Sequence, residues 1–343
     1  MRRGLLLFII ANLIVFGIII NYLFTLITLL FEDCSADAIH PADLPAPNSE
    51  VNVGINRPQY IPKILHQTWM NETIPEKWRV PQQSCLDLHK DWEYKLWTNE
   101  KSRDFIAKEY PWFLETFDNY PYPIMRADAI RYFVLATYGG IYLDLDDGCQ
   151  RPLDPLLSYR AWLRKTVPTG ISNDAMGSAP QHPFFLRVIQ NLQKYSRNWQ
   201  VPYVTVMYST GPLFLSVIWK EYMAEAKTDD EKRVRILMPD EYNKKPWAFF
   251  GVYKGSSWHQ GDAKTIFWLG QHWLLVTVLV IFLAVSLYTC GFCLYRRISA
   301  RRSPRARGYS PVATASVWPW RRRSSGSRDM VEASHKRYDQ DEV

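Results

Sequence analysis

Two long apolar stretches frame the chain. Residues 4–31 and 273–295 contain no charged side chain, and each exceeds the roughly 20 residues that cross the hydrocarbon core of a bilayer. The apolar part of a cleaved signal peptide runs for only about 7–15 residues, so the first stretch is interpreted as an uncleaved anchor. The pattern therefore predicts two transmembrane helices that flank a folded domain at residues 59–260.

Between the two spans, the spacing of apolar residues alternates between the spacing typical of strands and the spacing typical of helices. Short apolar runs predict strands at 61–69, 92–97, 141–145 and 234–238. Helical spacing predicts helices at 75–89 (interrupted at Pro81), 124–138, 183–199 and 211–226. Gly139-Gly140 is typical of a helix end. This alternation predicts an α/β fold with a largely parallel sheet.

The segments next to the spans have patterns of their own. Residues 32–58 mix Asp, Pro, Asn and Ala without periodicity and are interpreted as a stem. Residues 245–273 are dense in aromatic side chains, which favour both protein cores and the membrane–water interface. For the aromatic residues early in this segment, the pattern is compatible with a location in the core or at the membrane interface. Residues 261–272, which lead into the second span, are expected to lie at the interface.

The formal net charge of +7 is concentrated at the carboxyl end of the chain. Residues 296–343 contain 12 Lys and Arg against 5 Asp and Glu, and the remainder of the chain is neutral. No nucleic-acid partner is therefore expected for the folded domain. The basic segment lacks apolar periodicity and is interpreted as a disordered tail.

The basic residues also predict the membrane topology. They precede the first span and follow the second, so the positive-inside rule places residues 1–3 and 296–343 in the cytoplasm. Residues 32–272 then lie in the lumen of the Golgi or endoplasmic reticulum. Asn71 begins the sequence Asn-Glu-Thr and is a candidate N-glycosylation site there. Cys34, Cys85 and Cys149 would be lumenal, and one pair can be oxidised, although the sequence does not indicate which.

A carboxylate cluster follows the apolar strand at 141–145. Asp144 and Asp146 share one side of an extended chain, whereas Asp147 is expected to start the loop and point elsewhere. Ligands of α/β sheets bind at the carboxyl ends of strands. Mg²⁺ and Mn²⁺ prefer carboxylate oxygen, and such an ion neutralises a departing diphosphate. The cluster therefore predicts a site for a cation and a nucleotide sugar.

The residues around this cluster resemble glycosyltransferase family 32, whose members contain a DXD motif. The resemblance is carried by Arg126-Ala-Asp-Ala-Ile-Arg-Tyr-Phe-Val-Leu-Ala-Thr-Tyr-Gly-Gly-Ile-Tyr-Leu-Asp-Leu-Asp-Asp-Gly148, with Pro62–Trp69 and Ser172–Met176. Within the family, the two flanking spans are similar to those of the catalytic subunits of mannosyl inositol phosphorylceramide synthases.

This resemblance implies a fold, a reaction and partners. The expected fold is a GT-A type nucleotide-sugar transferase domain on the lumenal side of the Golgi or endoplasmic reticulum membrane. The expected reaction transfers mannose, with retention, from GDP-mannose to inositol phosphorylceramide, with Mn²⁺ (or Mg²⁺) as the cofactor. A multi-pass regulatory membrane subunit is the expected protein partner.

The resemblance also implies roles for individual residues. Asp146 is expected to bind the metal directly, and Asp144 to contact the sugar or ribose and support the metal. Asp128 and Arg131 are expected to hold donor-sugar hydroxyls, with a helix-surface ion pair as the alternative.

Five further residues have expected roles. Asn173 and Asp174 are expected to reach the transferred sugar or the acceptor, and otherwise to cap a loop. Trp69 is expected to stack on the nucleotide base, or else to belong to the core. His66 is a second candidate contact with the nucleotide or a buried structural histidine, and His259 is the candidate third metal ligand.

Two other functions remain open at this point. One is a mannosyl- or galactosyltransferase that acts on glycoprotein glycans. The other is a catalytically silent membrane scaffold, against which the intact Asp128, Arg131, Asp144 and Asp146 argue. A cation transporter is excluded because neither span contains a charged residue.

Overall fold

A computed structural model describes residues 2–44, 57–166, 169–226, 229–239, 248–253 and 261–302. These residues divide into two compact units, one ending at Trp273 and one beginning at Leu274. The helices are α1 (Arg2–Leu29), α2 (Glu76–Leu88), α3 (Asn99–Glu109), α4 (Leu114–Asp118), α5 (Pro123–Tyr138), α6 (Pro183–Tyr195), α7 (Pro202–Ser209), α8 (Pro212–Glu225), α9 (Gly261–Gln271) and α10 (Trp273–Arg302). The strands are β1 (Ile64–Thr68), β2 (Glu93–Trp97), β3 (Gly140–Leu143), β4 (Asp147–Cys149), β5 (Ala161–Lys165), β6 (Ile171–Ser178), β7 (Arg235–Leu237) and β8 (Phe250–Val252).

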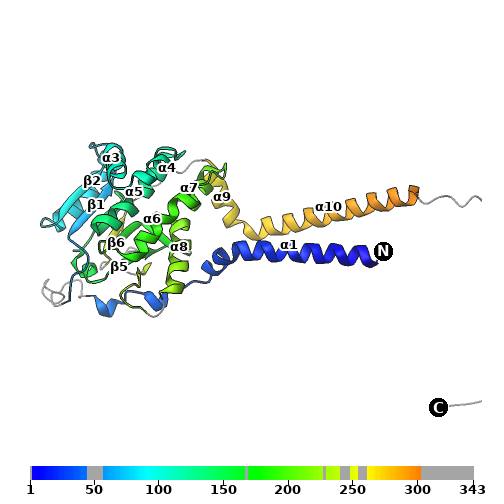
Figure 1. The fold of residues 1–343 in the computed structure, drawn as a ribbon, viewed down its shortest axis with the longest axis horizontal. Helices are drawn as coiled ribbons and strands as arrows, with labels where there is room; N and C mark the ends of the chain where they lie inside the picture. Colours follow the sequence, from blue (N-terminus) through cyan, green and yellow to red (C-terminus); the bar gives the residue numbers. More distant parts are fainter. Residues whose placement is uncertain are drawn as a thin grey trace, which may run out of the picture. The chain divides into compact units, whose positions relative to one another are not determined.

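The first unit is built on a mixed, mostly parallel sheet with the strand order β2-β1-β3-β6-β5-β7 (Figure 1). The pairs β1–β2, β1–β3 and β5–β7 are parallel, and β6 is antiparallel to both β3 and β5. A separate antiparallel pair, β4–β8, follows the carboxyl end of β3. The α/β class is confirmed, and the sheet is mostly parallel as predicted.

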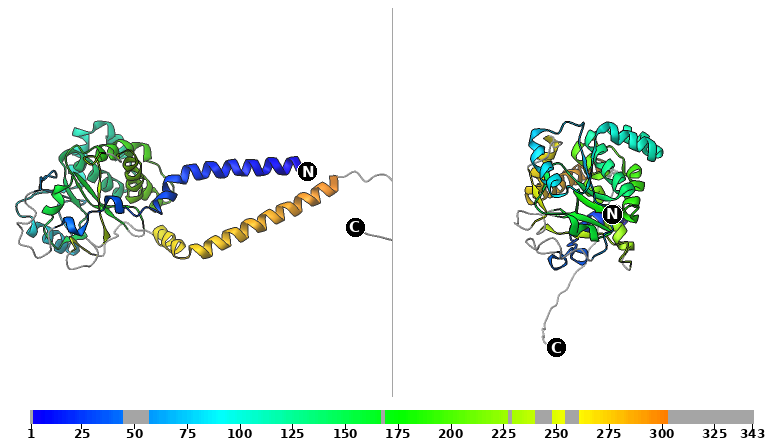
Figure 2. Two further views of the ribbon diagram at one scale, coloured as in Figure 1. Left: turned by 90° about the horizontal axis from the view of Figure 1, so that it is seen from below. Right: turned by 90° about the vertical axis from the view of Figure 1, so that its left-hand side faces the viewer.

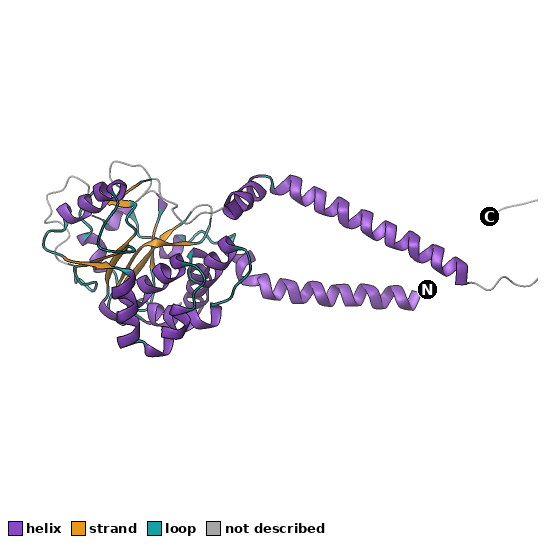
Figure 3. Cartoon of the chain, turned by 90° about the horizontal axis from the view of Figure 1, so that it is seen from above, coloured by secondary structure: helices purple, strands orange, loops and turns teal. Residues whose placement is uncertain are grey.

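Both faces of the sheet are covered, because alternate side chains of each strand enter different cores. Tyr142 of β3 belongs to a core shared with α5, α6 and α8, whereas Ile141 and Leu143 belong to a second core shared with α2 and the β4–β8 pair. Figure 3 shows the strands passing between helices. Because β3 is buried on both faces, an acidic residue directly after its carboxyl end lies where the chain leaves the core and reaches the surface.

The Gly139-Gly140 pair turns the chain from α5 directly into β3. Gly139 and Gly140 have φ angles of +67° and +95°, a region that other residues rarely adopt. A Cβ on Gly140 would lie 2.6 Å from the carbonyl oxygen of Ile64 in β1. Both glycines are thus needed for α5 and β3 to pack tightly enough to bring their polar residues together.

The structure departs from the expected elements in several places. Helix α2 continues through Pro81, although proline removes a helix hydrogen bond. Strand β3 ends at Leu143, two residues earlier than expected. Strands β5 and β6 were not predicted, since β6 reads Ile-Ser-Asn-Asp-Ala-Met-Gly-Ser and is formed by pairing on both sides rather than by β propensity.

The first described part of the expected stem is attached to the domain. The end of α1 lies beside α8 (Figures 1 and 2), and Leu29 is buried in the first core. Glu32 forms a salt bridge of 2.9 Å with Lys220 of α8. The backbone N–H of Ile39 donates to the carbonyl of Ile236 in β7 at 2.8 Å. The chain therefore passes from α1 into the domain without a free linker over residues 30–39.

One of the two expected spans corresponds to a candidate membrane helix, and the prediction of two spans is not confirmed. By length and composition, Trp273–Ile298 of α10 is suited to crossing a membrane. In α1, Ile9–Asn21 and Leu23–Leu29 satisfy the same criterion only as one bent span, with 58° between the two pieces. Among the described residues, one helix is thus long and apolar enough to cross a membrane by itself, and both membrane spans remain predictions.

The aromatic residues before α10 divide between core and surface. Phe249 and Phe250 are fully buried, so the core interpretation holds for them. The expected interfacial segment forms α9, on which Phe267, Trp268 and Leu269 are 46%, 50% and 41% exposed. Trp247 and Trp258 lie outside the described residues. Exposed rings next to an apolar helix are typical of an interfacial segment.

A disulfide joins Cys85 of α2 to Cys149 of β4, which resolves the choice that the sequence left open. Cys34 is a buried free thiol whose pKa is raised by burial to about 11. Asn71 is exposed, and its Oδ1 accepts the backbone N–H of Thr73 at 2.9 Å. The disulfide fixes the chain three residues after Asp146 to a helix on the other side of the cluster.

Reduction of this disulfide is expected to destabilise the first unit. The two cysteines are 64 residues apart, and a cross-link of that span stabilises a fold by about 4 kcal/mol in the loop-entropy description. A lower melting temperature in reductant would be measured by thermal unfolding. The Cys85→Ser/Cys149→Ser variant should be equally destabilised and insensitive to reductant; if reductant lowered its melting temperature further, Cys34 or another group would be responsible.

Candidate active site

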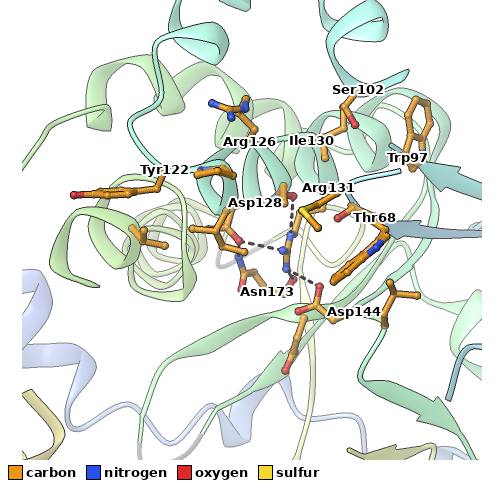
Figure 4. A pocket seen from close by; sticks show the side chains of 18 of the residues that line it. Thr68, Trp97, Ser102, Tyr122, Arg126, Asp128, Ile130, Arg131, Asp144 and Asn173 are labelled. Carbon is orange, nitrogen blue, oxygen red and sulfur yellow. Dashed lines mark hydrogen bonds and ion pairs between the residues drawn. The ribbon is translucent and has the colours of Figure 1, made fainter. Parts of the chain in front are cut away.

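A cavity of about 640 Å³ opens at the carboxyl ends of β1 and β3. Its walls come from β1, α5, β6, α7 and the turn after β3. The lining includes seven residues expected from the sequence to form a site: Trp69, Asp128, Arg131, Asp144, Asp146, Asn173 and Asp174. Figure 4 shows Asp128, Arg131, Asp144 and Asn173 directed toward one another. The cavity thus gathers residues that are more than 100 positions apart in the chain.

Arg131 is the centre of the polar side of the cavity. Its guanidinium forms ion pairs with Asp128 at 3.1 Å and with Asp144 at 3.2 Å, and it donates to the carbonyl of Asn173 at 2.6 Å. It also lies 4.7 Å from the centre of the Tyr142 ring. Arg131 is only 3% exposed, so the alternative of a helix-surface ion pair is wrong: the pair is internal.

Asp128 is held by neutral donors as well as by Arg131. The side-chain amide of Asn173 donates to Asp128 at 3.0 Å, and the hydroxyl of Thr210 donates to it at 2.9 Å. The Asn173 amide also donates to the hydroxyl of Tyr132 at 3.0 Å. Burial raises the pKa of the Asp128 carboxyl to about 6, although Arg131 opposes this shift. The network fixes both carboxylate oxygens in a preorganised orientation.

Asp144 and Asp146 lie in the turn that follows β3. The hydroxyl of Tyr142 donates to Asp144 at 2.7 Å, and the backbone N–H of Asp144 donates to the carbonyl of Asp174 at 2.8 Å. Burial raises the pKa of Asp144 and, together with the charge of Asp144, raises that of Asp146 to about 6. A carboxylate whose pKa is raised by a neighbouring carboxylate is typical of a site that binds a cation.

An irregularity in β6 directs Asn173 and Asp174 into the cavity. Leu163 of β5 is paired with Met176, but the next residue, Arg164, is paired with Ser172. The extra residues of β6 between these pairs bend the strand, as bulges next to active sites do. The carbonyl of Asn173 thereby reaches Arg131 of α5, and the carbonyl of Asp174 reaches the backbone N–H of Asp144 after β3.

Arg164 joins Asp174 to Asp147. The buried guanidinium donates to both oxygens of Asp147 at 3.0 and 3.1 Å, and it forms a close ion pair with Asp174. Asp147 is 2% exposed and begins β4, so the expectation of a loop residue is wrong. Asp147 does not line the cavity, because Arg164 from β5 draws it into the interior. Arg164 was not predicted, since the sequence gives no sign of this long-range contact.

The donor set fits a divalent cation that also binds phosphate. Asp144 and Asp146 offer carboxylate oxygens, and the buried Oδ1 of Asp174 has no hydrogen-bond partner among the described residues. The described part of the chain contains no cluster of three His, Cys, Asp or Glu side chains that could enclose a metal by itself. One or two carboxylates suffice when substrate phosphates complete the shell. His259, the expected third ligand, lies outside the described residues.

Trp69 and His66 have different environments, although they are close in sequence. Trp69 is partly buried, lines the cavity and packs against Ile74, Trp78 and Leu145. His66 is fully buried and does not line the cavity. Trp97 donates to its Nδ1 at 3.0 Å, so its Nε2 carries the proton and donates to the carbonyl of Gly139 at 2.8 Å.

These contacts correct the expectation that His66 binds a nucleotide. Both ring nitrogens are occupied by protein groups, and burial lowers the pKa of the ring to about 4, so it stays neutral. Its contact with Gly139 instead supports the glycine turn that precedes β3.

The arrangement is suited to binding a charged, hydroxyl-rich ligand. A cation near Asp146 would hold phosphate oxygens, while Asp128, Asn173 and the Arg131 network offer fixed acceptors and donors for hydroxyl groups. The partly buried face of Trp69 is available for stacking. Such preorganised groups favour a transition state in which charge develops on a departing diphosphate.

Comparison with known proteins agrees with this chemistry. A family model described as a glycosyltransferase sugar-binding region containing a DXD motif matches residues 75–162. The mannosyl phosphorylinositol ceramide synthase CSH1 of Saccharomyces cerevisiae is 53% identical, over 81% of this chain and 74% of its own length. Inositol phosphoceramide mannosyltransferase 3 of Schizosaccharomyces pombe is 47% identical, over 83% of this chain and 79% of its own length.

Among solved structures, the PaToxG glycosyltransferase covers 51% of this chain and 75% of its own, with 17% identity and a TM-score of 0.36. A score this low carries no argument about function.

Proposed function

Because the chain belongs to the DXD-containing glycosyltransferase family that includes the yeast mannosyl phosphorylinositol ceramide synthases, we propose that it transfers mannose from GDP-mannose to the inositol of inositol phosphoceramide. Its domain would be of the GT-A type, and the configuration of the mannose would be retained. The observation that supports this most is the cavity in which Asp146, the Asp128–Arg131 pair and Trp69 meet. These residues meet the three needs of a nucleotide-sugar donor: a metal site, a hydroxyl site and a stacking surface.

In this proposal each residue has a part that its position supports. Asp146, with help from Asp144, would hold Mn²⁺ or Mg²⁺ on the diphosphate, and the ion would supply Lewis-acid neutralisation of the leaving group. Asp128 would accept hydrogen bonds from mannose hydroxyls, while Asn173 and Asp174 would lie beside the sugar. Trp69 would stack on guanine. Arg131 would keep Asp128 and Asp144 ionised and in place.

The proposed lipid acceptor is supported by the elements next to the cavity. Asp262 of α9 lines the cavity, and α9 carries the exposed rings that lead into α10. A lipid headgroup could thus reach the site while its acyl chains stay in the bilayer. The disulfide is typical of an oxidising compartment, in agreement with a lumenal domain of the Golgi or endoplasmic reticulum. A multi-pass regulatory partner is also proposed, and co-purification from membranes would test it.

A transfer assay tests the proposed function. Membranes that contain the full chain would be given GDP-mannose or UDP-galactose, with inositol phosphoceramide or an N-glycan as the acceptor, and varied Mn²⁺. We expect mannose on inositol phosphoceramide only. Transfer to the N-glycan would favour the glycoprotein alternative, and transfer in none of the combinations would favour a silent scaffold.

Binding of a divalent cation is expected to weaken in acid. A carboxylate ligand must lose its proton, and the pKa of Asp146 is raised to about 6 by burial and by Asp144. Below pH 6, each unit of acidification should therefore weaken Mn²⁺ binding about tenfold, and the affinity should level off above neutrality. Mn²⁺ titration of the solubilised protein, followed by electron paramagnetic resonance, measures this. An affinity that did not change over this range would contradict the assignment.

A further inference from the structure

The cavity has one cationic side chain that the donor site does not use. Among the described lining residues, the cations are Arg126 and Arg131, whereas five aspartates line the same cavity: Asp128, Asp144, Asp146, Asp174 and Asp262. The guanidinium of Arg131 is occupied by Asp128, Asp144 and Asn173. Arg126 has a different environment, since the contact it makes with the described residues is a hydrogen bond to the carbonyl of Tyr120 at 3.1 Å.

The position of Arg126 separates it from the donor side. It lies five residues before Arg131 on α5, which corresponds to about 7.5 Å along the helix axis. In Figure 4, Arg126 and Tyr122 lie on one side of Arg131, and Thr68 and Trp97 lie on the other. Thr68, which directly precedes the expected base-stacking residue Trp69, and Arg126 are thus on different sides of Arg131 in this view.

The walls near Arg126 are apolar and lead toward α9. Tyr122, the residue before α5, lines the cavity together with Pro123 and Ile124 of α5 and with Pro202, Tyr203 and Val206 of α7. The backbone N–H of Tyr203 donates to Asp262 of α9 at 2.6 Å, and the Tyr203 ring packs edge-on against Phe267. Phe267 belongs to the exposed aromatic face of α9. The Arg126 side of the cavity is therefore the side that adjoins the expected membrane interface.

We propose that Arg126 binds the phosphate of the acceptor lipid and so selects an anionic acceptor. This rests on the proposed function, because it assigns the acceptor side of the same site. With five aspartates around the cavity, an anionic headgroup is repelled unless a cation receives it. A guanidinium is suited to two phosphate oxygens at once. An inositol ring held by its phosphate at Arg126 would extend toward Arg131 and present a hydroxyl group to the donor sugar.

The test uses the full chain in mixed micelles, with short-chain inositol phosphoceramide and a neutral analogue whose phosphate is methylated. In Arg126→Ala, the KM for the anionic acceptor should rise about 10- to 100-fold, the loss expected for a hydrogen-bonded charge. The KM for GDP-mannose should not change. The variant should no longer distinguish the anionic acceptor from the neutral one, whereas the original chain should prefer the anionic acceptor by a similar factor. Arg126→Lys should restore part of the preference.

Arg103→Ala is the matched control, because Arg103 is exposed outside the cavity and pairs with Asp118. It should leave both KM values unchanged. GDP binding and the melting temperature show whether Arg126→Ala is folded. If it is not folded, the preference of Arg126→Lys between the two acceptors is measured in its place.

A higher KM for GDP-mannose with an unchanged acceptor KM would overturn the assignment and place Arg126 on the donor diphosphate. A retained preference for the anionic acceptor would also overturn it. If the original chain transferred no mannose to inositol phosphoceramide, the proposed function would fail as well. If the original chain transferred mannose and Arg126→Ala had no effect on the acceptor KM, only the assignment of Arg126 would fail.

Discussion

Asp146→Ala is expected to reduce mannose transfer at least about a thousandfold, equivalent to about 4 kcal/mol of transition-state stabilisation. The reason is that the metal assigned to this carboxylate neutralises the charge that develops on the diphosphate. The fold should not suffer. Asp146 has a pKa raised to about 6 by burial and by Asp144, so its ionised form opposes folding near neutral pH and its removal relieves that repulsion. Transfer rates and thermal unfolding of the same preparation measure both effects.

Asp230→Ala is a suitable control for this experiment. Asp230 is a highly exposed carboxylate that pairs with Arg235 outside the cavity, and its loss should change neither transfer nor the melting temperature. If Asp146→Ala kept more than a tenth of the transfer rate, the metal assignment would be lost. If it failed to insert into membranes or to fold, the loss of transfer would not report on the site, and Asp146→Asn would replace it.

Arg131→Met is expected to affect stability as well as turnover. The substitution leaves Asp128 and Asp144 without their shared cation in a buried setting, which typically destabilises a protein by about 3–5 kcal/mol. Turnover should fall at least about a hundredfold, since the orientation of both carboxylates is lost. Chemical unfolding and transfer assays measure the two effects. The exposed pair of Arg103 and Asp118 provides the control, because Arg103→Met should change stability by only about 0–1 kcal/mol.

The pH dependence of this variant has a defined sign. Burial raises the pKa of Asp128 to about 6 in the folded protein, and Arg131 limits the rise. A raised carboxyl pKa means that stability is greatest when the group is protonated and is lost as the pH rises through the folded-state pKa. Without Arg131 that pKa rises further. The stability difference between the two proteins should thus be largest above pH 7 and shrink below pH 4, and a difference that grew in acid would contradict the burial of this pair.

The sequence predicted the centre of the site because that centre is local. Asp128 and Arg131 are one helical turn apart, and Gly139-Gly140 leads α5 directly into the strand before Asp144. Spacing and a known motif therefore pointed to four residues within 19 positions of one another that line the same cavity, and their roles stay predictions. The strands of the sheet were predicted only where the sequence has an apolar run.

Residues that depend on distant contacts were not predictable in the same way. Arg164 and Asp147 are 17 residues apart, and only the pairing of β5 with β6 brings the guanidinium to Asp147 and Asp174. The sequence around His66 is compatible with nucleotide binding and with a structural role. Only its hydrogen bonds with Trp97 and Gly139 identify the structural role. The disulfide was open for the same reason, since the three cysteines expected in the lumen allow three pairings and only the packing of α2 against β4 selects one.

The direct attachment of α1 to the domain has a kinetic consequence. Leu29 is part of the core, and Glu32 and Ile39 are fixed to α8 and β7, so if α1 is the predicted membrane anchor, the domain would have no flexible tether on which to tumble. An enzyme on a long tether sweeps its active site through many orientations, few of which face the lipid. With that anchor and the proposed lipid acceptor, the search for an acceptor would be reduced to diffusion in two dimensions. Turnover should accordingly follow the mole fraction of acceptor in the membrane rather than its amount per volume of suspension.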